Sequence, residues 1–101
     1  MPSSKLMLSY NIPPERQDVY LRFMLSQFIP ALQNIGLMNI GVWHTAYGNY
    51  PIRLIVFVAE DESTLERAME SDIWKKMEGE LQPLVTDYAR RLAPYEAGFQ
   101  F

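Results

Sequence analysis

The segment IRLIVFVA, residues 52–59, is an unusually apolar stretch of the chain. Its composition predicts a β-strand, and successive side chains of a strand point to opposite faces of a sheet. Both faces would be apolar, since one carries Ile55, Phe57 and Ala59 and the other carries Leu54, Val56 and Val58. A strand whose other face met water would alternate apolar and polar residues, so we expect both faces of this strand to be covered.

A second strand is predicted over LMNIGVWHTAY, residues 37–47. The sequence GNYP lies between the two strands, and glycine, asparagine and proline supply the backbone angles that a hairpin needs. A loop of two or four residues gives the same pairing parity, which places His44 and Arg53 on one face of the hairpin. We therefore expect these two side chains to meet.

The N-terminal part predicts a strand followed by a long helix. KLMLSY, residues 5–10, alternates with the period of a strand, and a helix is predicted from about residue 14 to residue 34. Pro30 removes a backbone donor and is expected to kink this helix near Gln27. Gly36 is the expected C-terminal stop of the helix.

The sequence DEST, residues 61–64, predicts the start of a second helix. Ser63 and Glu66 have the spacing of a capping box, in which each side chain bonds a free backbone amide. Apolar residues then recur every four positions, at Leu65, Met69, Ile73 and Met77. This spacing predicts one apolar face on the helix.

Gly79 and Pro83 are expected to break the second helix. A further helical piece is predicted over residues 81–92, and a final strand over YEAGFQF, residues 95–101. The order βαββαβ predicts a single α+β domain over residues 1–101. Its architecture would be a ferredoxin-like fold, with a four-stranded antiparallel sheet and the helices on one face.

The apolar third strand predicts a partner for the sheet. In a ferredoxin-like chain nothing covers the face opposite the helices, and a large exposed apolar patch usually marks an interface. We therefore expect a homodimer in which the two sheets pack face to face. The alternative is that this strand is simply the central strand of a tightly packed monomer.

Composition excludes several classes of function. The net charge is −3 with scattered basic residues, which does not favour nucleic-acid binding. The chain has no cysteine and one histidine, so we predict no thiolate nucleophile and no metal site. No apolar run is long enough for a signal peptide or a membrane span, which predicts a cytoplasmic protein.

Two stretches resemble a known family. GVWHTAYG at 41–48 and SDIWKKMEGELQPLVTDY at 71–88 resemble patterns of the dimeric α/β-barrel superfamily, most closely the NIPSNAP-type proteins. The superfamily also includes antibiotic-biosynthesis monooxygenases. The resemblance implies a dimer and a cavity for small hydrophobic or aromatic ligands. It also implies, for some members, oxidation of phenols by oxygen without metal or cofactor.

The residues of haem-degrading members do not recur as a set. Asn11 follows the first strand at a position where those members carry an important asparagine, but their histidine belongs to a helix. His44 lies on a predicted strand instead, and we predict no cofactor.

His44 and Arg53 are the candidate catalytic pair. An imidazole beside a guanidinium tends to stay neutral and could act as a general base, while Arg53 holds a phenolate or carboxylate. The alternative is that His44 packs and hydrogen-bonds locally and that Arg53 is a surface residue. The candidate ligand-binding residues are Tyr10, Asn11, Phe28, Trp43, Tyr47 and Trp74. Aromatic residues at such spacings also form cores, so these residues equally fit simple packing.

Two functions of different class remain open. The first is a dimeric barrel that binds a small aromatic or hydrophobic molecule and possesses monooxygenase-like activity without a cofactor. The second is a non-catalytic barrel that acts through association with itself or another protein. The first requires a cavity of a few hundred cubic ångströms. The second predicts that Phe28, Trp43 and Trp74 fill this space.

Overall fold

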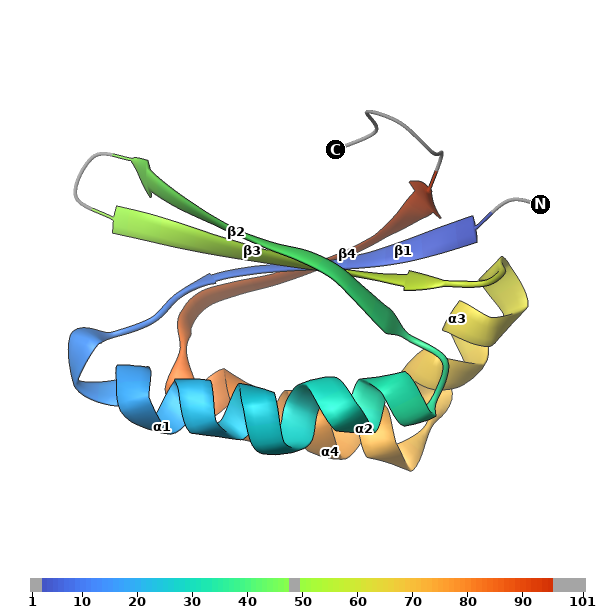
Figure 1. Ribbon diagram of the computed structural model, residues 1–101, viewed down its shortest axis with the longest axis horizontal. Helices are drawn as coiled ribbons and strands as arrows, with labels where there is room; N and C mark the ends of the chain where they lie inside the picture. The colour runs from blue at the N-terminus through green and yellow to red at the C-terminus, as the bar shows by residue number, and fades with distance from the viewer. Residues whose placement is uncertain (1–2, 48–49, 96–101) are drawn as a thin grey trace.

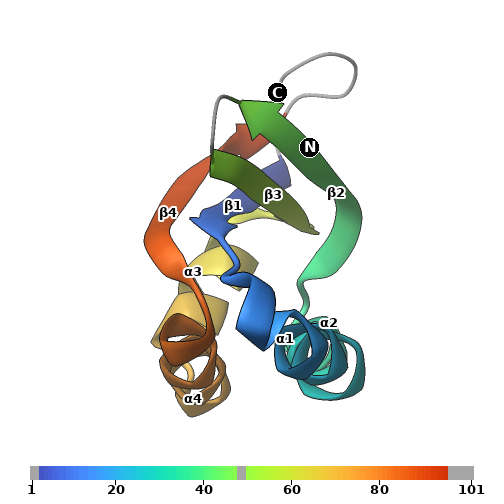
Figure 2. The same ribbon diagram turned by 90° about the vertical axis from the view of Figure 1, so that its left-hand side faces the viewer.

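Four antiparallel strands form one sheet, and the helices lie against one face of it (Figures 1 and 2). The computed structural model describes residues 3–47 and 50–95. The strands run in the spatial order β2-β3-β1-β4. Their bounds are β1 (Ser3–Asn11), β2 (Met38–Tyr47), β3 (Tyr50–Ala59) and β4 (Thr86–Tyr95). The α+β, ferredoxin-like fold predicted from the sequence is confirmed.

The strand β3 has one face toward the helices and one away from them, as its composition predicts. Ile55 and Phe57 are fully buried among residues of the helices and pair with Leu8 and Leu6 of β1. The opposite face of the sheet is called the open face below. It carries Met7, Trp43, Ile52, Leu54, Val56 and Val58.

The first helical segment covers residues 14–34, as predicted. It consists of η1 (Pro14–Arg16), α1 (Gln17–Phe23), the π-helical turn η2 (Met24–Phe28) and α2 (Ile29–Asn34). Pro30 has no amide hydrogen, so the ordinary α-helical partner of the Ser26 carbonyl is missing. The irregularity expected near Gln27 takes the form of this π-helical turn.

Gly36 ends the first helical segment, as the sequence predicts. Its φ angle is +93°, in the left-handed region that favours glycine. The Leu37 amide donates to the Leu32 carbonyl over 2.9 Å, and the Gly36 amide donates to the Gln33 carbonyl over 3.1 Å. These two bonds satisfy carbonyls at the end of the helix.

The second helical segment differs from the prediction at its start. It consists of α3 (Glu62–Glu70), α4 (Asp72–Leu81) and η3 (Gln82–Leu84). The predicted capping box of Ser63 and Glu66 is wrong, because Asp61 is the N-cap and accepts a 2.8 Å bond from the Thr64 amide. Ser71 separates α3 from α4, and its hydroxyl accepts from the Trp74 amide over 3.1 Å.

The end of the chain departs furthest from the prediction. Gly79 lies inside α4 and does not break it. Residues 86–92, predicted as helix, belong to β4, because β1 needs a partner on its second edge and pairs there with Arg90 and Leu92. Of the predicted strand 95–101, Tyr95 ends β4 and the others lie outside the described residues, as do the hairpin residues 48–49.

The core lies between the sheet and the helices. Phe28 packs edge-on against Trp74, with ring centroids 6.2 Å apart, and its ring is tilted against that of Phe57, with centroids 6.1 Å apart. All three side chains are buried. Among the described residues, no helix is long and apolar enough to cross a membrane.

Candidate functional site

A buried polar cluster lies at the end of β1, on the face that meets the helices. Tyr10 of β1 pairs directly with Arg53 of β3, and Tyr20 approaches from α1. The hydroxyls of Tyr10 and Tyr20 are hydrogen-bonded at 2.5 Å. The Arg53 guanidinium lies over the Tyr20 ring, 5.5 Å from its centroid. We call Tyr10, Tyr20 and Arg53 the polar cluster.

Burial determines the electrostatics of the polar cluster. Burial is the largest effect on both tyrosines and raises the pKa of the Tyr10 and Tyr20 phenols above the usual value, although the nearby Arg53 charge opposes this. Both phenols are therefore neutral at physiological pH. The Arg53 Nε is buried and has no hydrogen-bond partner within the described residues.

His44 lies beside this cluster. The register places it directly opposite Arg53 on β2, as the hairpin parity predicts. The His44 side chain is exposed, whereas that of Arg53 is half-buried. The solvent-accessible His44 is therefore next to the partly desolvated guanidinium of Arg53.

A cavity of about 280 Å³ adjoins the cluster at the end of β1. Its lining residues are Ser9, Tyr10, Asn11, Ile52 and Asp87. The Asn11 Nδ2 donates to Asp87 Oδ2 over 2.9 Å, while Asn11 Oδ1 is buried and has no partner in the described residues. Asp87 has a φ of +55°, a conformation that aspartate tolerates better than most residues.

The other candidate ligand-binding residues are dispersed. Phe28 and Trp74 lie in the central core. Trp43 is on the open face and 39% exposed, with its indole placed over Gly41, where a Cβ atom would come within 2.5 Å of the ring. The side chain of Tyr47 lies outside the described residues. Of this set, Tyr10 and Asn11 line the cavity at the end of β1, whereas the candidate catalytic residues His44 and Arg53 do not line it.

Comparison with known proteins places the fold. No protein-family model matches the sequence, and neither does any curated protein. A NIPSNAP domain protein from Burkholderia xenovorans has a TM-score of 0.67 at 14% identity, with 97% of this chain and 99% of that chain covered. A NIPSNAP family protein from Agrobacterium tumefaciens has a TM-score of 0.67 at 16% identity, with coverages of 94% and 87%. The chain has the fold of NIPSNAP-domain proteins.

A further similar structure extends this comparison. A putative antibiotic biosynthesis monooxygenase from Nitrosomonas europaea has a TM-score of 0.65 at 6% identity, with 92% of this chain and 88% of that chain covered. The resemblance predicted from the sequence is therefore confirmed at the level of the fold. Identities this low carry no information about individual site residues.

Sequence reasoning missed two tyrosines of this NIPSNAP-type fold. Tyr20 had a usable signal, since it heads the apolar row of the first helix that faces the sheet. Tyr88 was assigned to a helix, but on β4 it stacks on Tyr10 with centroids 6.4 Å apart. Its hydroxyl donates to Glu78 Oε2 over 2.8 Å, which ties β4 to α4.

Proposed function

We propose that the protein binds a small aromatic molecule with an acidic group, a phenol or a carboxylate, beside the polar cluster. The observation that carries this proposal is the buried Arg53 Nε, which has no hydrogen-bond partner among the described residues. A buried donor on a cation is costly unless it is hydrogen-bonded. An anionic oxygen of a ligand would satisfy it.

The tyrosine pair supports the same ligand chemistry. Two hydroxyls carry two protons, and the bond between Tyr10 and Tyr20 uses only one of them. The second proton can be donated to a ligand oxygen. Both phenols stay neutral because burial raises their pKa, so they remain donors at physiological pH. The aromatic rings around them favour an aromatic ligand body.

The proposal extends to oxygenation of a bound phenol without a cofactor. A structural neighbour is described as a putative antibiotic biosynthesis monooxygenase, and His44 stands opposite Arg53. The His44 imidazole would accept the phenol proton, and the Arg53 guanidinium would stabilise the resulting phenolate. A phenolate is richer in electrons than a phenol and is the form that reacts more readily with oxygen. One oxygen atom enters the ring and the other leaves as water, and the phenol itself supplies the electrons, so that 1-naphthol would give a naphthoquinone.

Binding and oxygen consumption test these two steps separately. We expect 2-naphthoate and 1-naphthol to raise the melting temperature of the wild type. The variant Arg53→Met should bind 2-naphthoate about 10-fold or more weakly, because it loses a charged hydrogen bond to the carboxylate. Arg91→Met is the matched control on the open face and should bind as the wild type does. Equal affinity of wild type and Arg53→Met, or no binding by the wild type, would refute the proposal.

Oxygen uptake with 1-naphthol measures the second step. His44→Ala should abolish uptake while 2-naphthoate still binds, because the carboxylate needs no base. Absence of uptake by the wild type at saturating 1-naphthol would limit the function to binding.

Self-association through the open face is the second candidate function. Apolar side chains make up most of this face, which also carries Lys5, Ser9 and Arg91, and Trp43 and Ile52 are each about two-fifths exposed. We propose that a second copy packs against it, as in a sandwich of two sheets. Val58→Asp should convert a dimer to monomer in light scattering. Val56 is fully buried within its own chain, so a variant there would report folding instead.

A further inference from the structure

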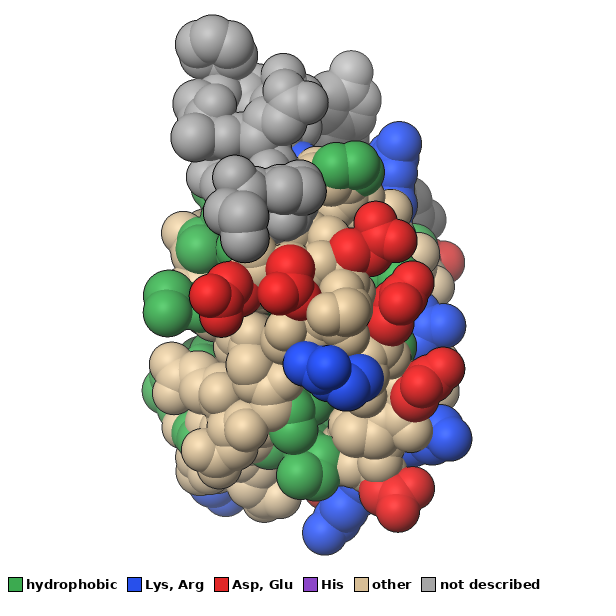
Figure 3. Space-filling model, turned by 90° about the vertical axis from the view of Figure 1, so that its right-hand side faces the viewer, with side chains coloured by type: hydrophobic (Ala, Val, Ile, Leu, Met, Phe, Trp, Pro, Cys, Tyr) green, Lys and Arg blue, Asp and Glu red, His purple; other side chains and the backbone are tan. Residues whose placement is uncertain are grey.

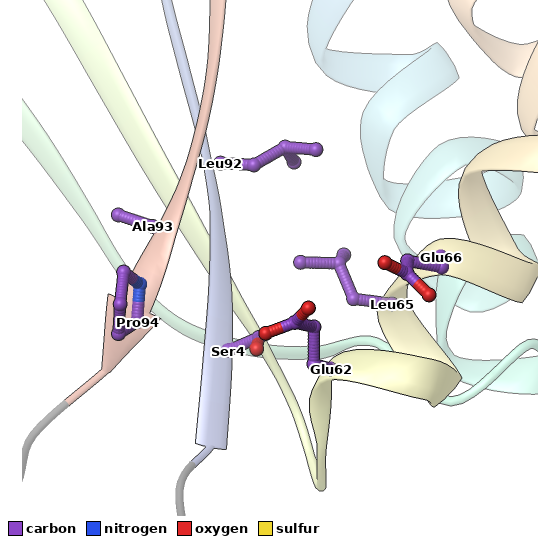
Figure 4. Close-up of a pocket in the computed structure, with 7 residues that line it drawn as sticks. All are labelled: Ser4, Glu62, Leu65, Glu66, Leu92, Ala93 and Pro94. Carbon is purple, nitrogen blue, oxygen red and sulfur yellow. The ribbon is translucent and has the colours of Figure 1, made fainter.

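A second cavity, of about 220 Å³, lies at the other end of β1, between the sheet and α3 (Figure 4). Its lining residues are Ser4, Glu62, Leu65, Glu66, Leu92, Ala93 and Pro94. Ser4 and Tyr10 are six residues apart on one strand, so the two cavities are separated by roughly 20 Å. This second cavity, called the α3 pocket, is independent of the polar cluster.

Two carboxylates stand over the α3 pocket. Glu62 and Glu66 are one helical turn apart on α3, and both side chains are exposed. Neither forms an ion pair with the described residues. The surrounding surface is acidic as well, since Glu60, Asp61 and Glu70 flank them and Arg67 is the one basic residue of α3 (Figure 3). The pocket therefore favours a cation.

A largely buried serine adds an uncharged acceptor. Ser4 is only 6% exposed and lines the pocket, and its hydroxyl makes no hydrogen bond to the described residues. Figure 4 shows the Ser4 hydroxyl beside the Glu62 carboxylate. The hydroxyl opens into the pocket and is not one of the fully enclosed atoms without a partner, so a donor of a bound ligand can take the place of water there.

The rest of the α3 pocket is apolar. Leu65 is buried at its base, while Leu92 of β4 is 48% exposed and points toward α3 (Figure 4). Pro94 follows on the same strand and closes the side of the pocket. An exposed leucine beside two carboxylates suits a ligand with a charged head and an apolar body.

We propose that the α3 pocket binds a primary ammonium group carried on a short apolar chain or ring. An ammonium group has three N–H donors, which match the Ser4 hydroxyl and the carboxylates of Glu62 and Glu66. The apolar body would lie on Leu65 and Leu92. A volume of 220 Å³ is below the roughly 300 Å³ at which ordinary ligand sites begin, which restricts the ligand to a small amine.

A titration followed by NMR tests the proposal directly. 2-Phenylethylamine, protonated at neutral pH, should give saturable amide shifts in α3 and at the start of β1. 2-Phenylethanol has the same shape without the charge and should bind at least about 10-fold more weakly, the effect of losing a charged hydrogen bond. The absence of saturable shifts with the amine up to about 10 mM, a weak affinity for any specific site, overturns the proposal.

Matched variants identify the residues responsible. The double variant Glu62→Gln/Glu66→Gln should weaken amine binding about 10-fold or more, and Ser4→Ala a few-fold. Glu70→Gln, on the same helix but outside the pocket, should bind as the wild type does. Amine affinity unchanged in the double variant, or reduced equally by Glu70→Gln, would show that only diffuse negative charge attracts the ligand and would overturn the site. Circular dichroism confirms that each variant is folded.

Discussion

The hydrogen bond between Tyr10 and Tyr20 links β1 to α1. It joins two buried hydroxyls at 2.5 Å, so removal of either hydroxyl leaves the other without this partner. We expect Tyr10→Phe and Tyr20→Phe each to lower the free energy of unfolding by about 1 kcal/mol. The double variant should cost less than the sum, because the shared bond is lost only once.

Urea denaturation of the four proteins gives this coupling energy. Strictly additive losses in the cycle would mean that the two hydroxyls do not stabilise each other, and the protonated pair assumed for the ligand site would then be wrong.

Buried tyrosines also affect the stability at high pH. Burial raises the pKa of Tyr10 and of Tyr88 far above the ordinary value of about 10, which the unfolded chain retains. Above pH 10 the unfolded state therefore loses protons that the folded state keeps, and stability falls as pH rises. Each such group contributes a slope of about 1.4 kcal/mol per pH unit.

Chemical denaturation between pH 9 and pH 11.5 measures this slope. The free energy of unfolding of Tyr10→Phe should fall less steeply with pH than that of the wild type, because the variant lacks one of the buried phenols. An equal slope in both proteins would indicate that Tyr10 ionises in the folded state.

At the scale of the elements, replacement of two glycines by alanine is expected to change the stability of the protein in opposite directions. A Cβ atom at Gly79 would meet nothing within 4 Å, and the residue lies in the interior of α4. Gly79→Ala should therefore stabilise the protein by roughly 0.5–1 kcal/mol. Gly36 has a φ of +93°, and a Cβ atom there would lie 2.9 Å from Thr64 Cγ2. Gly36→Ala should destabilise it.

Thermal melting of both variants tests whether Gly79 lies inside a helix, as in the structure, or breaks it, as the sequence pattern predicts. A loss of stability in Gly79→Ala would support the helix break that the sequence predicts at this residue.

The sequence predicted the correct structure for segments whose local pattern agrees with their place in the folded chain. The helix over residues 14–34, its stop at Gly36 and the two faces of β3 follow from periodicity and backbone chemistry. The pairing of His44 with Arg53 follows from hairpin parity. A final strand was expected, but its predicted start at residue 95 was wrong, because Tyr88 and Leu92 also fit helical spacing and only pairing with β1, far away in sequence, makes residues 86–92 a strand.

The contact between Tyr10 and Tyr20 in the candidate site could not be predicted from the sequence, for a related reason. Parity along a hairpin relates His44 to Arg53, but no period relates Tyr20 of α1 to Tyr10 of β1. Their contact depends on how the helix crosses the sheet, which the packing of the whole core determines. Likewise, the cap of α3 at Asp61 was missed because two neighbouring residues can both cap, and the choice depends on where the strand β3 ends.

At the scale of the whole molecule, the open face links association to stability. The helices cover one face of the sheet (Figure 2). The other face carries apolar side chains, and Trp43, Ile52 and Met38 are substantially exposed there. If a second copy buries these side chains, association stabilises the folded state by mass action. The melting temperature of the wild type should then rise with protein concentration.

The variant Val58→Asp separates this effect from the stability of the chain itself. Val58 is half-buried on the open face, so a carboxylate there would be desolvated in a dimer but would reach water in a monomer. We expect its melting temperature to be independent of concentration from about 1 to 100 μM, a range that spans ordinary dimer affinities. Lys76→Asp, on the exposed side of α4, is the control and should keep the wild-type dependence. A wild-type melting temperature that does not change with concentration, together with monomeric mass, would mean that the open face is stable in water, and the second candidate function would then fail.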